Sequence, residues 1–72
     1  MRSEKLTTAR DLYFNHQYHE ATLEFQKWFQ EGDIDTRVEA AYFIGKILSI
    51  LDFPLNQINF YFDFVLKSGN SF

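Results

Sequence analysis

The sequence has 72 residues, no cysteine and a formal net charge of −3, which allows a single domain and excludes disulfides, thiol chemistry and cysteine zinc sites. A chain of this length buries only about 60% of the surface that its unfolded form exposes. Without a partner, its free energy of unfolding is therefore expected to be about 5 kcal/mol or less. Acidic and basic side chains are mixed with no basic block, so nucleic acid is not expected as a partner.

Hydropathy argues against a membrane or secretory segment. Residues 1–6 are charged and lead into no apolar run, so no secretory signal is visible. The longest apolar stretch, residues 47–51, is interrupted by Ser49 and is far too short to span a bilayer. These features predict a soluble, cytoplasmic protein without membrane insertion.

Aromatic residues are unusually frequent, with nine Phe, four Tyr and one Trp. The C-terminal third also carries little charge, because Asp52, Asp63 and Lys67 are its only charged residues from position 47 onwards. An aromatic side chain buries on the order of 150–250 Å², so these residues can fill a small core or serve a partner.

Apolar positions three and four residues apart predict two helices in the first half of the chain. The first runs from about residue 3, with Ser3 as N-cap, to residue 15. The second runs from about residue 18 to 31 and ends before Gly32, a residue typical of the position just after a helix. Their apolar stripes contain Leu6, Ala9, Leu12 and Tyr13, then Tyr18, Ala21, Phe25, Trp28 and Phe29.

Two further helices are predicted in the second half. Residues 36–39 have the capping-box order, in which Thr36 and Glu39 satisfy reciprocal backbone donors, so the third helix is expected to begin at residue 36. It should end near residue 51, because Pro54 disfavours helical geometry before it. Pro54 suits the first turn of a fourth helix, which reaches about residue 67 before the break at residues 68–71.

A strand is the alternative for residues 58–66, since Phe, Tyr, Val and Ile favour strands and several alternate here with Asn or Asp. A lone strand would lack a strong partner elsewhere in the chain, so a fourth helix is the more consistent prediction. The predicted fold is all-α, with two antiparallel helix–turn–helix hairpins, residues 3–31 and 36–67, in a single domain of residues 1–72.

The two halves also repeat each other. Ala9 corresponds to Gly45 and Leu12 to Leu48, each 36 residues later, while Phe25 corresponds to Phe62, 37 residues later. Residues 17–27 (QYHEATLEFQK) and 39–46 (EAAYFIGK) resemble the tetratricopeptide repeat, whose first helix carries a small residue in its middle. The second repeat departs from that pattern at Ile58, where the family has a small alanine, and needs one extra residue around positions 53–55.

The resemblance implies a right-handed solenoid fragment in which the first helix of each hairpin lines a concave groove. Arg10 and Lys46 would sit at equivalent places, and such a basic pair among apolar side chains suits an acidic, partly apolar peptide or helix. The family's carboxylate clamp is not reproduced. Core packing of the aromatic residues and ordinary surface charges remain the alternative. The implied groove residues are Leu6, Arg10, Tyr13, Phe14, Tyr42, Lys46, Ser49 and Ile50.

The last predicted helix is apolar around nearly its whole circumference, whereas repeat arrays normally finish with a polar capping helix. An uncovered apolar face rarely stays in water, so Phe60, Tyr61 and Phe64 are predicted to form an interface. The function that follows is a non-enzymatic scaffold or small chaperone-like subunit that binds a segment of another protein. The alternative is a small helical regulatory or inhibitor protein that acts as a homodimer.

Catalytic and cofactor sites are not predicted. His16, His19 and Glu20 could in principle hold a metal ion, but a polar turn is their more plausible role. Asp33 and Asp35 resemble a calcium-loop fragment that lacks the other oxygen ligands, so capping of the third helix is favoured. Neither a glycine-rich phosphate loop nor a recognisable nucleophile is present.

Overall fold

The computed structural model describes residues 4–68 and confirms an all-α chain. A 3₁₀ turn, η1 (Glu4–Leu6), leads into four helices: α1 (Thr7–Phe14), α2 (Tyr18–Glu31), α3 (Ile34–Ile50) and α4 (Leu55–Ser68). The strand alternative for residues 58–66 is wrong, because this segment lies inside α4. Ser3, the expected N-cap of the first helix, and residues 69–71 of the expected break lie outside the described residues. Ser68 was also expected in that break, but it is the last residue of α4.

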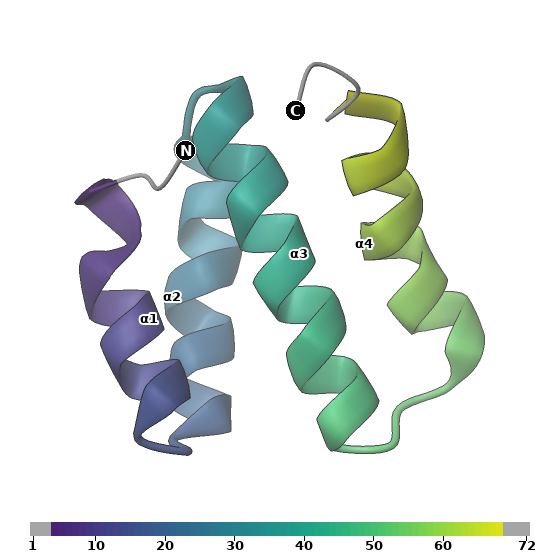
Figure 1. Ribbon diagram of the computed structural model, residues 1–72, viewed down its shortest axis with the longest axis horizontal. Coiled ribbons are helices and arrows are strands. Elements are labelled where there is room, and N and C mark those ends of the chain that lie inside the picture. Colours follow the sequence, from purple (N-terminus) through teal and green to yellow (C-terminus); the bar gives the residue numbers. More distant parts are fainter. Residues whose placement is uncertain (1–3, 69–72) are drawn as a thin grey trace.

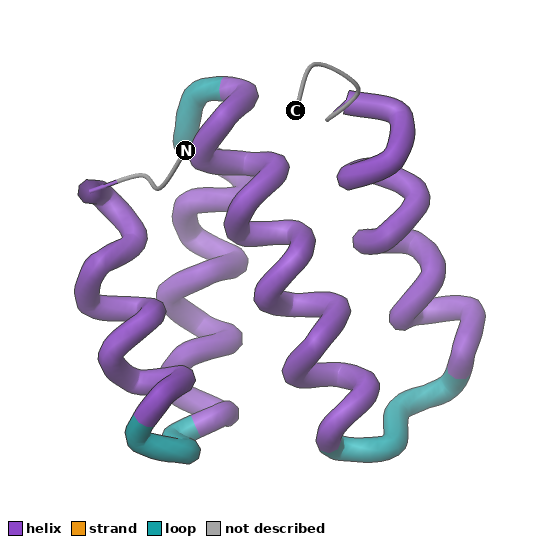
Figure 2. The backbone as a smooth tube through the Cα atoms, viewed as in Figure 1, coloured by secondary structure: helices purple, strands orange, loops and turns teal. Residues whose placement is uncertain are grey.

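The helices pack in chain order, each against the one before it. They alternate in direction, and short turns join them (Figures 1 and 2). In Figure 1, α2 lies behind α1 and α3, while α4 runs alongside α3. Neighbouring helices in sequence are therefore neighbours in space, whereas α2 and α4 meet through aromatic side chains without close backbone contact.

The core lies where α3 meets α2 and α4. Phe25 of α2 stacks on Phe43 of α3, with ring centroids 4.9 Å apart and planes only 5° from parallel. α1 reaches α3 through side chains, since the rings of Tyr13 and Phe43 are 5.1 Å apart. The buried cluster consists of Leu6, Ala9, Ala21, Phe25, Ala40, Ile44, Ile47, Leu48 and Ile58.

Two turns with the same geometry end α1 and α3. After α1, the amide of Gln17 donates to the carbonyl of Leu12 at 2.9 Å, and the amide of His16 donates to that of Tyr13 at 3.0 Å. After α3, the amide of Phe53 donates to the carbonyl of Leu48 at 2.9 Å. In this arrangement, the Schellman motif, the residue that follows the C-cap adopts a left-handed conformation.

The left-handed residues are His16 (φ 62°) and Asp52 (φ 65°). Neither is a glycine, although Asp and His tolerate this region better than most residues do. The two turns stand 36 residues apart, the same offset that relates Leu12 to Leu48 in the sequence. The internal repetition thus extends to the backbone hydrogen bonds of the turns.

α3 begins two residues earlier than the capping-box pattern predicts. Asp33 is the N-cap, and its side-chain oxygen accepts a hydrogen bond from the amide of Thr36 at 2.9 Å. The backbone and side-chain hydrogen bonds from Thr36 lower the pKa of Asp33. Thr36 itself is buried inside the helix, so the prediction that it begins the helix is wrong.

Gly45 brings α4 close to α3. A Cβ atom at this position would lie 2.6 Å from a ring carbon of Phe62, closer than side chains approach one another. The absent side chain leaves a notch in the surface of α3, and the Phe62 ring occupies it. Gly45 and Phe62 therefore set how tightly α4 packs.

Candidate protein-binding surfaces

Many large apolar side chains remain exposed for a protein of this size. Each of the following is more than 40% exposed: Phe14, Leu23, Ile34, Tyr42, Ile50, Leu51, Phe53, Leu55, Phe60 and Leu66. Scattered apolar residues are normal on a protein surface, but contiguous groups mark binding sites. Two surfaces of this protein carry such groups.

The first surface lies over α1 and α3, and we call it the α1–α3 face: Tyr13, Phe14, Tyr42, Lys46 and Ile50. The ammonium group of Lys46 lies 5.8 Å from the ring centre of Tyr13 and 5.4 Å from that of Tyr42. The phenol groups of Tyr13 and Tyr42 raise the pKa of Lys46, so this side chain is charged at neutral pH. The structure thus brings three of the predicted groove residues together.

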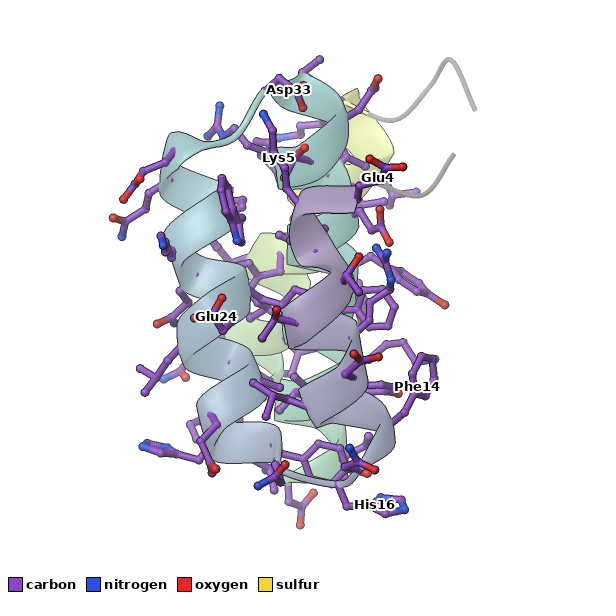
Figure 3. The ribbon with its side chains drawn as sticks, turned by 90° about the vertical axis from the view of Figure 1, so that its left-hand side faces the viewer. Glu4, Lys5, Phe14, His16, Glu24 and Asp33 are labelled. Carbon is purple, nitrogen blue, oxygen red and sulfur yellow. The ribbon has the colours of Figure 1, made fainter. Side chains whose placement is uncertain are left out.

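Phe14 and Ile50 extend the α1–α3 face with exposed apolar surface, 59% and 50% respectively. In Figure 3 the side chain of Phe14 projects away from the α1–α2 pair, on the side opposite to Glu24. Its ring lies 5.3 Å from that of Tyr13, which connects it to the Lys46 cluster. Ser49, the remaining groove candidate, is also exposed.

Arg10 and Leu6, which were expected in the groove, have internal roles instead. The guanidinium of Arg10 forms a salt bridge of 2.9 Å with Glu39 of α3, and both side chains are nearly buried. Leu6 is completely buried in the core. Of the basic pair predicted from the sequence, Arg10 and Lys46, only Lys46 is therefore displayed on this face.

The aromatic residues of α4 divide between the interior and the surface. Tyr61 and Phe64 are half-buried against Phe29 of α2, with ring centroids 5.4 Å and 5.0 Å away. The guanidinium of Arg37 lies 5.0 Å from the Phe64 ring and donates a hydrogen bond to the Phe29 carbonyl at 2.8 Å. Phe60 is 61% exposed and is the member of the predicted interface that projects most into solvent.

The second surface is a hollow of about 570 Å³ between α2 and α4, which we call the α2–α4 trough. Leu48 of α3 contributes to its lining from between the two outer helices, and none of the lining residues among 4–68 is Asp, Glu, Lys or Arg. The described lining of the trough therefore combines apolar groups with hydrogen-bonding amides and the imidazole of His19. Its lining residues are His19, Thr22, Leu23, Gln26, Leu48, Phe53, Asn56, Gln57, Phe60 and Tyr61.

Of the trough residues, only Phe60 and Tyr61 were predicted from the sequence to form an interface. A signal was present in α2, where Leu23 interrupts an outer face carrying Glu20, Glu24 and Lys27. Leu23 is 57% exposed, which no core requirement explains. That Leu23 and Phe60 line the same trough could not be predicted from the sequence, because it depends on how α2 and α4 are placed around α3.

Metal and membrane sites are not found in the part of the chain that the structure describes. No three His, Cys, Asp or Glu side chains among residues 4–68 gather to hold a metal ion. His16 instead shares a hydrogen bond of 2.9 Å with the Tyr18 hydroxyl. Within the same residues, no helix has both the length and the apolar character needed to cross a membrane.

Comparisons with known proteins identify no relative of this chain, so its function is inferred from these two surfaces. Scans against protein-family models, curated proteins and solved structures each returned no match.

Proposed function

We propose that this protein is a non-enzymatic binding module that holds a helical segment of another protein in the α2–α4 trough. The observation that supports it is the apolar wall on each side of the trough, formed by Leu23 of α2 and Phe60 of α4, which are 57% and 61% exposed. When a partner covers exposed apolar side chains of this size, the free energy of binding becomes more favourable.

The chemistry of the lining favours one kind of occupant. Gln26, Asn56 and Gln57 offer amide donors and acceptors without charge, and Leu48 lines the space between the outer helices. An amphipathic helix presenting apolar and small neutral polar side chains matches this surface. Such a helix would lie against α2, α3 and α4 together and would complete a bundle around α3.

Two observations support a tetratricopeptide-like arrangement within this proposal. The turns after α1 and α3 repeat their hydrogen bonds at an offset of 36 residues, and a small residue, Ala9 or Gly45, is buried in each of these helices. The second repeat would then place its aromatic ring, Phe62, in the notch at Gly45. A scaffold or small chaperone-like subunit is the role that fits such a module.

The proposal is tested with charges placed in the trough. Leu23→Glu and Phe60→Glu should each weaken partner binding about tenfold or more, because a carboxylate would be desolvated against apolar surface. Leu66→Glu is the matched control, since Leu66 is 69% exposed and does not line the trough. A photo-crosslinking residue at Gln26 would identify the partner in cells, and calorimetry with the purified partner would measure each affinity.

Retained affinity in both trough variants, or equal loss in Leu66→Glu, would refute the proposal. Melting curves followed by circular dichroism would verify that each variant is folded.

A second copy of the chain is the other candidate occupant. α4 displays Phe60 and Phe64 beside Asp63 and Lys67, which together line a smaller hollow of about 270 Å³. Two antiparallel copies of α4 could place Asp63 of one chain opposite Lys67 of the other, as a homodimeric regulatory protein would require. Sedimentation of the wild-type chain at micromolar concentration distinguishes the two cases, because a monomer would exclude this alternative.

A further inference from the structure

The α1–α3 face carries a positive charge in a setting built almost entirely from aromatic rings. Lys46 projects from α3 between Tyr13 of α1 and Tyr42 of α3, and its ammonium group lies within 6 Å of both ring centres. A lysine in such a position is less free to move than one on an open helix surface, so less entropy is lost when it binds an anion.

The rings that hold Lys46 are themselves fixed by further rings. Phe43 lies between them, 5.1 Å from Tyr13 and 5.7 Å from Tyr42. Tyr42 also lies 6.4 Å from Phe62 of α4, the ring seated at Gly45. Three helices thus contribute to one array, and the site for the ammonium group exists before any ligand arrives.

The charge of Lys46 is not matched by an acidic side chain of the described chain. The salt bridge found among residues 4–68 joins Arg10 to Glu39 and does not involve Lys46. Lys46 therefore attracts negative charge from outside the molecule. A carboxylate would accept hydrogen bonds from the ammonium group, with the two phenol groups close by.

The surroundings select among anions. Phe14 and Ile50 expose apolar surface at the edge of the face, so a ligand is favoured if apolar groups flank its negative charge. Nucleic acids and anionic membranes rely on several cations acting together, whereas the described residues of this face present one. An acidic side chain between large apolar side chains of a protein segment satisfies both requirements.

We propose that Lys46, framed by Tyr13 and Tyr42, anchors an acidic side chain of an otherwise apolar partner segment. This is a second binding site, separate from the α2–α4 trough in position and in chemistry, and it does not rest on the trough being occupied. The chain would then engage partners on two surfaces, one selecting for a carboxylate and the other for an uncharged helix.

The test uses two short peptides that differ only in charge, acetyl-Leu-Glu-Phe-amide and acetyl-Leu-Gln-Phe-amide, titrated into the full chain labelled with ¹⁵N. We expect the glutamate peptide to bind about threefold to tenfold more tightly, the range for one charge-assisted contact at a partly exposed site. Its shift changes should centre on Tyr13, Tyr42 and Lys46.

Lys46→Met keeps the apolar stem without the charge, so it should remove the preference for the glutamate peptide and leave affinity for the glutamine peptide unchanged. Lys27→Met is the matched control, because Lys27 also lies over an aromatic ring, 5.3 Å from the centre of Trp28, but on α2. This variant should retain the full preference.

Three outcomes would overturn the proposal: equal binding of the two peptides, no binding of either, or a preference that persists in Lys46→Met. Shift changes centred on Leu23 and Gln26 instead would place the peptide in the trough and would also contradict it. Because Leu23→Glu and Phe60→Glu alter the other surface, failure here leaves the proposed function of the trough standing.

Discussion

Asp52 adopts a left-handed backbone conformation that costs most residues other than glycine about 1–2 kcal/mol. Glycine removes this cost, while its greater freedom in the unfolded chain offsets part of the gain. We expect Asp52→Gly to raise the free energy of unfolding by about 0.5–1 kcal/mol. Urea denaturation would measure the change.

Asp52→Ala serves as the control, because it removes the same carboxylate without relieving the backbone. This variant should be no more stable than the wild type. An equal gain in both variants would show that net negative charge, and not the left-handed conformation, limits stability at this turn.

Residue-scale features show where sequence patterns mislead. Thr36 and Glu39 have the order of a capping box, but Asp33 caps α3, and Glu39 pairs with Arg10. In the folded protein, Thr36 is buried and Glu39 forms a salt bridge, so neither side chain caps the helix as the local motif suggests. The turn at residues 15–17 was predicted, whereas its left-handed residue was not, because His16 lacks the glycine signature.

At the scale of elements, α3 and α4 depend on the notch at Gly45. Alanine is the better helix former by about 1 kcal/mol, yet its Cβ would lie 2.6 Å from the Phe62 ring. We expect Gly45→Ala to lower the free energy of unfolding by about 1–2 kcal/mol, the range for overpacking a closed contact. Chemical denaturation monitored by circular dichroism checks this value.

The effect of Gly45→Ala on the free energy of unfolding should change sign when the Phe62 ring is removed. In a Phe62→Ala background, the same Gly45→Ala change meets no ring and should raise stability by about 0.5–1 kcal/mol through helix propensity alone. A destabilising effect of similar size in both backgrounds would show that Phe62 is not the cause.

The first three helices were predictable from the spacing of their apolar residues and their end signals, whereas the fourth was predicted because a lone strand would have lacked a partner. The predicted second helix agrees with α2, Tyr18–Glu31, and the predicted end at Gly32 agrees with its boundary. The role of the aromatic residues in α4 was only partly predictable. Tyr61 and Phe64 pack on Phe29, a contact between segments more than 30 residues apart that periodicity does not report.

At the scale of the whole molecule, the Arg10–Glu39 salt bridge is one of the side-chain links between the first and second hairpins. Both partners are nearly buried, so Glu39→Gln would leave a desolvated cation. We expect the free energy of unfolding to fall by about 2–4 kcal/mol, a large part of the total for a domain of this size.

Replacing both Arg10 and Glu39 should lower the free energy of unfolding far less than replacing Glu39 alone. Arg10→Met combined with Glu39→Leu removes both charges and keeps apolar volume, so its stability should lie within about 1 kcal/mol of the wild type. Denaturant melts of the single and double variants would compare them. A double variant as unstable as Glu39→Gln would mean that hydrogen bonds, and not charge burial, dominate the link.

The two surfaces differ in how far the sequence predicts them. Tyr13, Tyr42 and Lys46 were grouped through the repeat pattern, and their side chains do meet. The α2–α4 trough combines side chains of helices that are far apart in the sequence, so neither helix alone contains its signal. A surface of this kind emerges only once the helices are placed around α3.

The notch at Gly45 also fixes the axial position of α4 relative to α3. If α4 slid by one helical turn along α3, the Phe62 ring would face Ala41 or Ser49, each of which has a Cβ atom where Gly45 has none. Axial slippage is thus blocked in both directions. The spacing between the walls of the trough is set before a ligand arrives, so the trough should accept helices of one width and reject bulkier ones.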